Sequence, residues 1–358
     1  MKTVPPTMRA LVAHSADRYH FEAAWPTPEI GPDDILLQIE ACGICAGDLK
    51  ARQRAARFWG GDGMPAYCEP PFIPGHEFVG RIVAVGERRR DAWNVGERIV
   101  AEQILPCGHC RYCRQGQYWL CDPHDVFGFR SSLNGGMAEY VRLPANALLY
   151  RVPETFTRAE AALIEPFACS LHAVRRSAAS VDDVVVLAGA GTLGLGMVSA
   201  LRQRNPRQLI VLDLNEKRLE RARVCGADLT LNPAQEDVIN RVLELTDGYG
   251  CDVYIEATGH PSAVGQGLEM ICKAGRFIEF SVFGAPATVD WSIIGDAKEL
   301  TLLGSSLSPY CYESTIAGIA DGTRVTEGIV THEFALEDWE AAFETAASTD
   351  SIKVLIVP

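Results

Sequence analysis

The sequence predicts an α/β protein with two domains, a mostly β domain followed by a domain built on a doubly wound parallel sheet. Three observations support this prediction. The chain has 358 residues, which is more than one hydrophobic core usually serves. Short β-branched segments between Gly and Pro residues fill positions 8 to about 150. From about residue 180, apolar strands alternate with segments of helical period.

The first domain is expected to consist of short strands. Alternating apolar residues with flanking turn residues mark strands at 8–14, 33–43, 78–86, 97–103 and 137–143. The period changes to 3.6 over residues 157–178, which predicts a helix leading out of this domain. His172 lies on the apolar face of that helix, where we expect it to be a core residue.

The second domain is expected to alternate strands with helices. Strands are predicted at 184–188, 207–215, 252–259, 275–282 and 300–306, and helices after residue 191 and over 216–227. The last fifty residues have mixed character and end in a strand at 351–358. We therefore place the domains at residues 1–168, 169–305 and 306–358, the last of these being a return to the first domain.

Composition and charge exclude several classes of partner. The hydrophobic fraction of 47% is ordinary for a globular protein. A net charge of -13 repels polyanions, so we expect no nucleic acid and no membrane as partner, and a small molecule as ligand. The chain shows no apolar stretch of signal-peptide length and no run of about 18 apolar residues, which leads us to expect a cytoplasmic protein.

Four of the twelve cysteines lie in one short segment, CGHCRYCRQGQYWLC. Cys107, Cys110, Cys113 and Cys121 have the spacing C-x2-C-x2-C-x7-C, and four thiolates this close in sequence can surround one tetrahedral zinc ion. A closed site of this kind leaves no position for substrate. Its expected role is therefore structural, in a lobe over residues 104–124.

A second group of metal-binding residue types lies upstream. Cys45 in CGICAGD, with His76 and Glu77 in PGHEFVG, would supply a thiolate, an imidazole and a carboxylate from two loops. Three protein ligands leave a fourth position open, which is the arrangement of a catalytic zinc site. Taken alone, a GHE segment is more typical of a surface turn. The seven remaining cysteines are expected to be reduced residues of the core or of a pocket wall.

A glycine-rich turn follows the predicted strand at 184–188 and opens a helix. Gly189, Gly191 and Gly194 form a G-x-G-x-x-G pattern, which permits a tight turn, close approach of a pyrophosphate and close packing of the helix. Asp213 ends the next strand, where a carboxylate accepts hydrogen bonds from a ribose 2′-OH and repels a 2′-phosphate. The pattern predicts a Rossmann domain that binds NAD.

These motifs occur in a characteristic order: CGICAGD, PGHEFVG, the cysteine lobe, IEP, GAGTLG and IEATGHPSAV. In this order they resemble the zinc-dependent medium-chain dehydrogenase family over nearly the whole chain. IEPFACSLHAVRR looks like the sorbitol or polyol dehydrogenase branch, and CAGDLK with GYGCDVYIEATGHPS is similar to erythritol/threitol dehydrogenases. The resemblance implies a GroES-like barrel in the first domain, one catalytic and one structural zinc, NAD as cofactor, and a homo-oligomer, either a tetramer or a dimer.

The resemblance also implies roles for individual residues. Cys45, His76 and Glu77 would hold the catalytic zinc, and Glu165 of IEP would be a further ligand or hold the metal-bound water. Alternatively, Glu165 is only an acid in the first turn of a helix, favoured there by the macrodipole. Asp48 would orient a ligand. Further positions that match cofactor contacts are Leu193, Arg218, Ser281, Val282 and Phe283.

The sequence departs from the family pattern at the proton exit. Gly47 stands where most members have Ser or Thr, and Lys50 stands where many have His. The usual relay from a hydroxyl to an imidazole therefore cannot operate. Either Lys50 with the cofactor ribose, or Glu165 with a metal-bound water, would pass the proton to solvent. The alternative for Lys50 is a solvated surface lysine.

Gln103 is the informative residue for the substrate, because the matching position lines the pocket in related alcohol dehydrogenases and is often aromatic there. A polar amide suits a polyhydroxylated substrate. Four aromatic residues are expected either as pocket walls or as core residues: Phe58, Trp59, Phe127 and Tyr310. The arginine that clamps polyols in sorbitol dehydrogenases is not evident in GSSLSPYCYES, which argues against sorbitol itself.

The function expected from these features is oxidation of a short sugar alcohol, such as erythritol or threitol, to the ketose or aldose by a zinc enzyme that uses NAD. A secondary-alcohol or 2,3-diol dehydrogenase is the alternative among enzymes. A non-catalytic structural protein that binds zinc and a nucleotide is disfavoured, because it would have no reason to keep an open zinc site.

Overall fold

The computed structural model describes residues 4–61 and 63–358, which divide into two compact units. Unit 1 spans Met1–Glu165 and Val330–Pro358, and unit 2 spans Pro166–Ile329. Residues 306–329 lie with unit 2, whereas the sequence analysis assigns them to the first domain. Part of the reason is that Arg175 donates hydrogen bonds to the Tyr310 carbonyl at 2.7 Å and to Ser314 Oγ at 2.9 Å.

Unit 1 is mostly β. Its strands are β1 (Thr7–Ser15), β2 (Arg18–Pro26), β3 (Ile35–Gly43), β4 (Glu77–Val85), β5 (Arg98–Ala101), β6 (Ile104–Leu105), β7 (Asp125–Val126), β8 (Tyr140–Leu143), β9 (Leu149–Arg151), β16 (Val330–Ala335) and β17 (Lys353–Val357). Its helices are α1 (Ala46–Arg52), α2 (Ala56–Trp59), α3 (Arg111–Arg114), α4 (Arg158–Ala162), α11 (Trp339–Ala347) and the 3-10 turns η1 (Glu87–Arg89), η2 (Tyr118–Leu120) and η4 (Leu336–Asp338). Helix α5 (Ile164–Ser177) begins in unit 1 and continues in unit 2.

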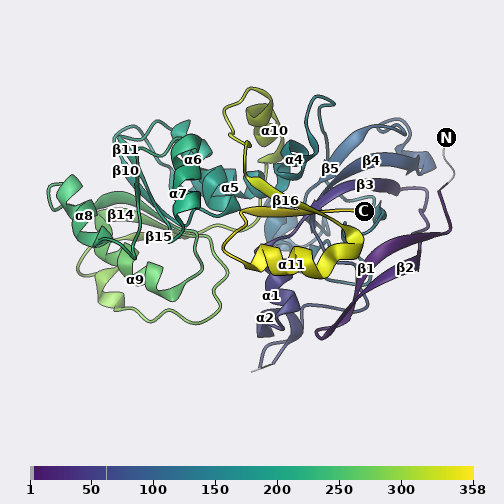
Figure 1. Cartoon of the computed structure of the whole chain (residues 1–358), viewed down its shortest axis with the longest axis horizontal. Helices are drawn as coiled ribbons and strands as arrows, with labels where there is room; N and C mark the ends of the chain where they lie inside the picture. The colour runs from purple at the N-terminus through teal and green to yellow at the C-terminus, as the bar shows by residue number, and fades with distance from the viewer. Residues whose placement is uncertain (1–3, 62) are drawn as a thin grey trace. The chain divides into compact units, whose positions relative to one another are not determined.

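The main sheet of unit 1 brings distant segments together. Among the described residues its strand order is β16-β17-β3-β4-β5-β9, and β8 also pairs with β3. Antiparallel pairing places Gly43 opposite both Glu77 on β4 and Leu355 on β17. Figure 1 shows β3 and β4 side by side, with the C-terminal segment next to them. The end of β3, the start of β4 and the last strand of the chain therefore meet at one place.

Unit 2 is a doubly wound α/β domain. Its strands are β10 (Val184–Ala188), β11 (Gln208–Leu212), β12 (Leu229–Leu231), β13 (Cys251–Glu256), β14 (Ile271–Glu279) and β15 (Thr301–Gly304). Its helices are α6 (Thr192–Arg202), α7 (Glu216–Cys225), α8 (Val238–Leu245), α9 (Pro261–Met270), α10 (Tyr312–Ala320) and the 3-10 turn η3 (Trp291–Ile293). The strand order is β12-β11-β10-β13-β14-β15 with parallel pairing throughout. The expected fold class is thus confirmed.

The chain reverses its direction of winding at β10. Strands β11 and β13 lie on either side of it, so its carboxyl end is the topological switch point where ligands bind in open α/β sheets. Helices α6 and α7 cover one face of the sheet, and α8 and α9 cover the other (Figure 1). Nothing in the described part of the chain combines the length and hydropathy that a membrane-spanning helix needs.

Two of the elements that the sequence did not predict, β2 (Arg18–Pro26) and α9 (Pro261–Met270), have identifiable reasons. Most residues of β2 are exposed or half-buried, so this strand lacks the apolar alternation of its neighbours. Helix α9 contains Gly265 and Gly267, and glycine is a poor helix former. Gly267 is required by packing, because a Cβ there would overlap the ring of Tyr254.

Candidate functional site

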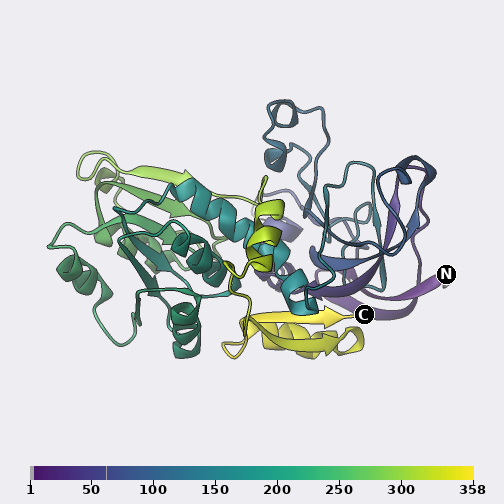
Figure 2. The same ribbon diagram turned by 90° about the horizontal axis from the view of Figure 1, so that it is seen from above.

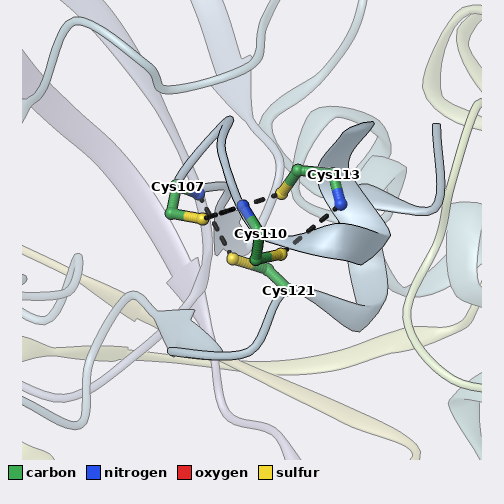
Figure 3. A group of neighbouring side chains, drawn as sticks. All are labelled: Cys107, Cys110, Cys113 and Cys121. Carbon is green, nitrogen blue, oxygen red and sulfur yellow. Dashed lines mark hydrogen bonds between the residues drawn. The ribbon is translucent and has the colours of Figure 1, made fainter. Parts of the chain in front are cut away.

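The cysteine lobe gathers its four thiols around one point. Cys107, Cys110, Cys113 and Cys121 offer sulfur atoms that all lie within 4.8 Å of one another. Figure 3 shows the hydrogen bonds between them: the Cys110 backbone N–H donates to the Cys107 sulfur at 3.3 Å, and the Cys113 N–H donates to the Cys110 sulfur at 3.4 Å. The Cys107 N–H donates to the Cys121 sulfur at 3.2 Å. Pairing of β6 with β7 closes the base of this lobe.

This group fits a closed zinc site. The sulfur atoms of Cys107 and Cys113 are 4.0 Å apart. A tetrahedron with zinc–sulfur bonds of about 2.3 Å has edges of about 3.8 Å, so the four sulfur atoms need little rearrangement. Hydrogen bonds from the backbone N–H groups of Cys113 and Asp122 lower the pKa of the Cys110 thiol to about 6, which makes it ready to bind as a thiolate.

A buried carboxylate connects this lobe to the sheet. Glu102 follows β5 and is 1% exposed. It accepts a hydrogen bond from Tyr118 Oη of the lobe at 3.0 Å and one from Tyr150 Oη of β9 at 2.7 Å. Burial raises the pKa of Glu102 to about 7, although both tyrosines act in the opposite direction. The sequence gives no signal for this contact, because the three residues come from separate segments.

The raised pKa of Glu102 predicts how stability changes with pH. In the folded protein the carboxyl group of Glu102 keeps its proton up to about pH 7, whereas in the unfolded chain it loses the proton near pH 4.5. The contribution of Glu102 to stability is therefore full below pH 4.5 and declines by about 3 kcal/mol as the pH rises to 7. We expect urea unfolding of Glu102→Gln to lack this decline. The exposed Glu87→Gln is the control, and a Glu102→Gln curve parallel to the native one would contradict the expectation.

The second candidate group for metal binding lies where β3, β4 and β17 of unit 1 meet. Cys45 follows β3 and is the N-cap of α1, His76 precedes β4, and Glu77 is the first residue of β4. One ligand atom from each residue lies within 4.8 Å of the others. Burial, with the charges of Glu77 and Asp48, raises the pKa of the Cys45 thiol, so a metal ion must displace its proton.

The contacts of His76 also fit a metal ion. Asp48 is 1% exposed, and its Oδ2 accepts a hydrogen bond from the Cys45 backbone N–H at 2.9 Å. Its Oδ1 faces His76 Nδ1 at 3.9 Å, and neither atom has a hydrogen-bond partner among the described residues. With a carboxylate beside Nδ1, the other ring nitrogen, Nε2, is the atom that could bind a metal ion, and such a carboxylate is the usual support for a metal-binding histidine.

Lys353 is a site residue that the sequence analysis missed. It begins β17, is almost fully buried, and donates hydrogen bonds to Glu77 Oε2 and to the Ile44 carbonyl, the latter at 3.0 Å. Burial acts to lower the pKa of Lys353, but Glu77, Cys45 and Glu165 outweigh it, so the pKa is raised and the side chain stays cationic. A lone lysine at the start of the apolar strand KVLIV is the signal that could have found it.

The other candidate residues around this group have different positions. Glu165, near the start of α5, is buried and lies outside the set of ligand atoms above, but its charge acts on both Cys45 and Lys353. Lys50 is half-buried on α1. A Cβ added at Gly47 would lie 3.9 Å from Cys45 Sγ and from His76 Cε1, so a side chain at this position would enter the site without a clash.

The aromatic candidates are mostly packing residues. Phe127 is fully buried edge-to-face against Phe78, in the core and not on a pocket wall. Phe58 also belongs to the core and stacks on Phe129, whose ring centroid is 5.7 Å from that of His76. Phe129 is thus the aromatic residue that reaches the metal-binding group, and the sequence analysis did not select it.

The remaining pocket candidates differ in exposure. Trp59 donates its indole N–H to the Ala51 carbonyl at 2.7 Å and packs near Phe72. Tyr310 belongs to unit 2 and is 61% exposed. Gln103 is buried next to Glu102. Gln103 is therefore a buried residue of unit 1, whereas Tyr310 is an exposed residue of unit 2.

The glycine-rich turn of unit 2 has the geometry of a dinucleotide site. Gly189 follows β10 with φ of +104°, a conformation that favours glycine. A Cβ at Gly194 would overlap the Gly189 carbonyl, so α6 can pack this closely only without a side chain there. A Cβ at Gly191 would meet no described atom within 4 Å, so the N-terminal end of α6 is accessible to a phosphate group.

The other cofactor candidates cluster at the same edge of the sheet. Asp213, directly after β11, accepts hydrogen bonds from the Ala190 N–H at 2.7 Å and the Asn215 N–H at 2.8 Å. Leu193 lies in the first turn of α6, and Arg218 in the first turn of α7. Residues 281–283 (Ser281, Val282 and Phe283) follow β14, and Ser281 Oγ donates to the Glu256 carbonyl at 3.5 Å.

Comparisons with known proteins identify the family. The family described as alcohol dehydrogenase GroES-like domain matches residues 31–154, and the family described as zinc-binding dehydrogenase matches residues 192–320. The erythritol/L-threitol dehydrogenase of Mycolicibacterium smegmatis is 45% identical over 358 residues, covering 99% of each chain. The chain belongs to the zinc-dependent medium-chain dehydrogenase family.

Two further relatives agree with this assignment. The sorbitol dehydrogenase of Bacillus subtilis is 30% identical over 363 residues, covering 99% of each chain. A chain from Sinorhizobium meliloti 1021, described as a zinc-binding dehydrogenase bound to NADP, has a TM-score of 0.89 at 28% identity, over 98% of this chain and 99% of that one. Membership of the family confirms the expected class, an oxidoreductase that requires zinc and a nicotinamide cofactor.

Proposed function

We propose that the protein oxidises a secondary or terminal hydroxyl of a short polyol, such as erythritol or threitol, and that NAD accepts the hydride. The similarity to the erythritol/L-threitol dehydrogenase, which extends over 99% of both chains, carries the substrate class. The group of Cys45, His76 and Glu77 supports the chemistry, since three ligands of mixed type leave a position for the substrate oxygen. The product is the corresponding ketose or aldose.

We assign the catalytic zinc to Cys45, His76 and Glu77, and the structural zinc to the four cysteines of the lobe. When bound, the catalytic zinc supplies a Lewis acid that lowers the pKa of the substrate hydroxyl, and NAD supplies the hydride acceptor. Asp48 holds His76 in position, and Lys353 holds Glu77 while balancing part of the negative charge of the group.

A screen of NAD reduction over C4 to C6 polyols and small monoalcohols tests the proposal. We expect erythritol or threitol to give the highest kcat/KM with the zinc-loaded enzyme. If 2,3-butanediol or a secondary monoalcohol gives the highest value, the secondary-alcohol or 2,3-diol alternative replaces the polyol assignment. Failure of the zinc-loaded enzyme to reduce NAD with any of these alcohols would contradict the proposed activity itself.

Asp213 is expected to set the cofactor preference. We assign the pyrophosphate to the turn from Gly189 to Gly194 and the ribose to Asp213, whose carboxylate would repel the 2′-phosphate of NADP. NAD should therefore give a higher kcat/KM than NADP. Asp213→Asn is the suitable variant, because it removes the charge and keeps an acceptor for one of the two backbone N–H groups, of Ala190 and Asn215, that Asp213 binds. This variant should narrow the difference in kcat/KM between NAD and NADP. Equal kcat/KM values with NAD and NADP in the native enzyme would contradict the assignment of the ribose to Asp213.

The proton exit is expected to use Lys50 or Glu165, because Gly47 cannot supply the usual hydroxyl. If Lys50 carries the proton, Lys50→Ala should lower oxidation at neutral pH by about tenfold or more and recover at high pH, where hydroxide accepts the proton. If Glu165→Gln lowers oxidation at neutral pH and Lys50→Ala does not, the proton passes through the carboxylate of Glu165. Lys273→Ala, an exposed residue of β14, is the control. Unchanged pH profiles in both variants would exclude both routes.

We infer a homo-oligomer, either a dimer or a tetramer, because β15 is an edge strand of its sheet and Leu302 on it is 42% exposed. Light scattering at assay concentration tests this inference.

We also infer that the protein acts in the cytoplasm. The cysteines are free thiols within residues 4–61 and 63–358, and the two thiol-containing sites need a reducing compartment to stay that way.

A further inference from the structure

A cavity in unit 2 is lined by three arginine side chains. It has a volume of about 250 Å³ and is formed by α5, the residues after α6, and the region of α10. Arg175 lies on α5, Arg204 follows α6, and Arg324 follows α10, while Gln203 and Ser314 add polar groups. Figures 1 and 2 both show α10 beside α5. None of these residues belongs to the zinc or NAD sites assigned above.

Arg324 is buried with an unused donor. It is 8% exposed, and its Nε has no hydrogen-bond partner in the part of the chain that the structure describes. One terminal nitrogen donates to the Thr323 carbonyl at 3.4 Å, which is a long and weak contact. Burial lowers the pKa of Arg324, and the charges of Arg175 and Arg204 lower it further. The cavity thus contains a desolvated guanidinium group that neighbouring positive charges destabilise.

The surroundings only partly compensate this charge. The carboxylate of Asp321 attracts Arg324 and acts to raise its pKa, but it is one negative charge beside three arginines. The C-terminal ends of α6 and α10 add partial negative charge, which accounts for some of the arginines near them. Arg175 and Arg204 form no ion pair with a carboxylate among the described residues. An excess of positive charge therefore remains in a protein whose net charge is -13.

We propose that this cavity binds a small phosphate-bearing anion, either inorganic phosphate or a phosphomonoester with a short carbon chain. The planar donors of arginine match phosphate oxygens in pairs, and a dianion would offset the repulsion between the three side chains. A volume of about 250 Å³ has room for a phosphate group with a few carbon atoms.

Calorimetric titration of the zinc-loaded, NAD-saturated enzyme tests this proposal. Saturation with NAD fills the phosphate site at the glycine-rich turn. We expect inorganic phosphate to bind once per chain at low ionic strength, with a Kd on the order of 1 mM. Arg204 is exposed, so Arg204→Gln should weaken binding about tenfold without disturbing the core. Arg223→Gln, an exposed arginine of α7 paired with Glu220, should bind phosphate as the native enzyme does.

The outcomes separate the possible ligands. Tighter binding of glycerol 3-phosphate than of inorganic phosphate identifies a phosphomonoester site, and equal affinities identify a site for phosphate itself. Arg324→Gln should also lose binding, and the melting temperature measured without phosphate shows whether that variant is folded. The proposal is overturned if Arg204→Gln and folded Arg324→Gln bind phosphate as tightly as the native enzyme, or if acetate binds as well as phosphate does.

Discussion

Replacing Cys45 by Ser is expected to lower kcat for erythritol by at least about 1000-fold while the protein stays folded. A serine hydroxyl is a poor ligand for zinc, since it is not deprotonated at neutral pH, whereas Cys45 would bind as a thiolate. Serine is a favourable N-cap residue, so the start of α1 at this position should be preserved. The measurements are kcat, zinc per chain by elemental analysis, and far-UV circular dichroism.

The matched control is Cys110→Ser, which removes one thiol from the closed group of the lobe. We expect the native enzyme to contain two zinc ions per chain and each variant to contain one. Cys110→Ser should lower stability by several kcal/mol, while the molecules that remain folded keep most of their turnover. One zinc ion or none in the active native enzyme would contradict the assignment of two sites, and native turnover in Cys45→Ser would exclude Cys45 as a ligand.

The preference for tetritols over monoalcohols is expected to be the other large effect. Erythritol or threitol should exceed butanol in kcat/KM by about 1000-fold, because a site built to hydrogen-bond extra hydroxyls leaves buried polar groups unpaired when the substrate lacks them. Gln103 is buried beside Glu102 and holds the amide that we expect to serve this purpose. Gln103→Phe should shrink the ratio at least tenfold, mainly by weakening polyol turnover.

The same substitution at an exposed glutamine shows whether the effect of Gln103→Phe on the ratio of tetritol to butanol kcat/KM is specific to Gln103. Gln115 lies on the surface of the cysteine lobe, and Gln115→Phe should leave the ratio of tetritol to butanol unchanged. If butanol is turned over as well as the tetritols by the native enzyme, the polyol assignment is wrong and the simple alcohol alternative takes its place. A Gln103→Phe variant with the native ratio would remove Gln103 from the substrate site.

The sequence alone determined the parts of this protein that are local in the chain. The thiols of the lobe come from one short segment, and the glycine-rich turn joins a strand to the helix that follows it, so spacing is enough to predict both. The alternation of strands and helices after residue 180 likewise predicts the doubly wound sheet. The ligand roles of Cys45, His76 and Glu77 remain predictions, although the fold brings their ligand atoms within 4.8 Å of one another.

The contacts between distant segments depend on the fold and could not be predicted from the sequence. Lys353 meets Glu77 across 276 residues because β17 and β4 both pair with β3, and no local pattern encodes that register. Glu102 acquires its raised pKa only when its neighbours exclude water from it. The arginines of the unit 2 cavity come from three separate elements. The spacing of residues along the sequence is enough to predict a site whose residues all come from one segment. Which charged groups from distant segments are buried together depends on strand pairing and packing.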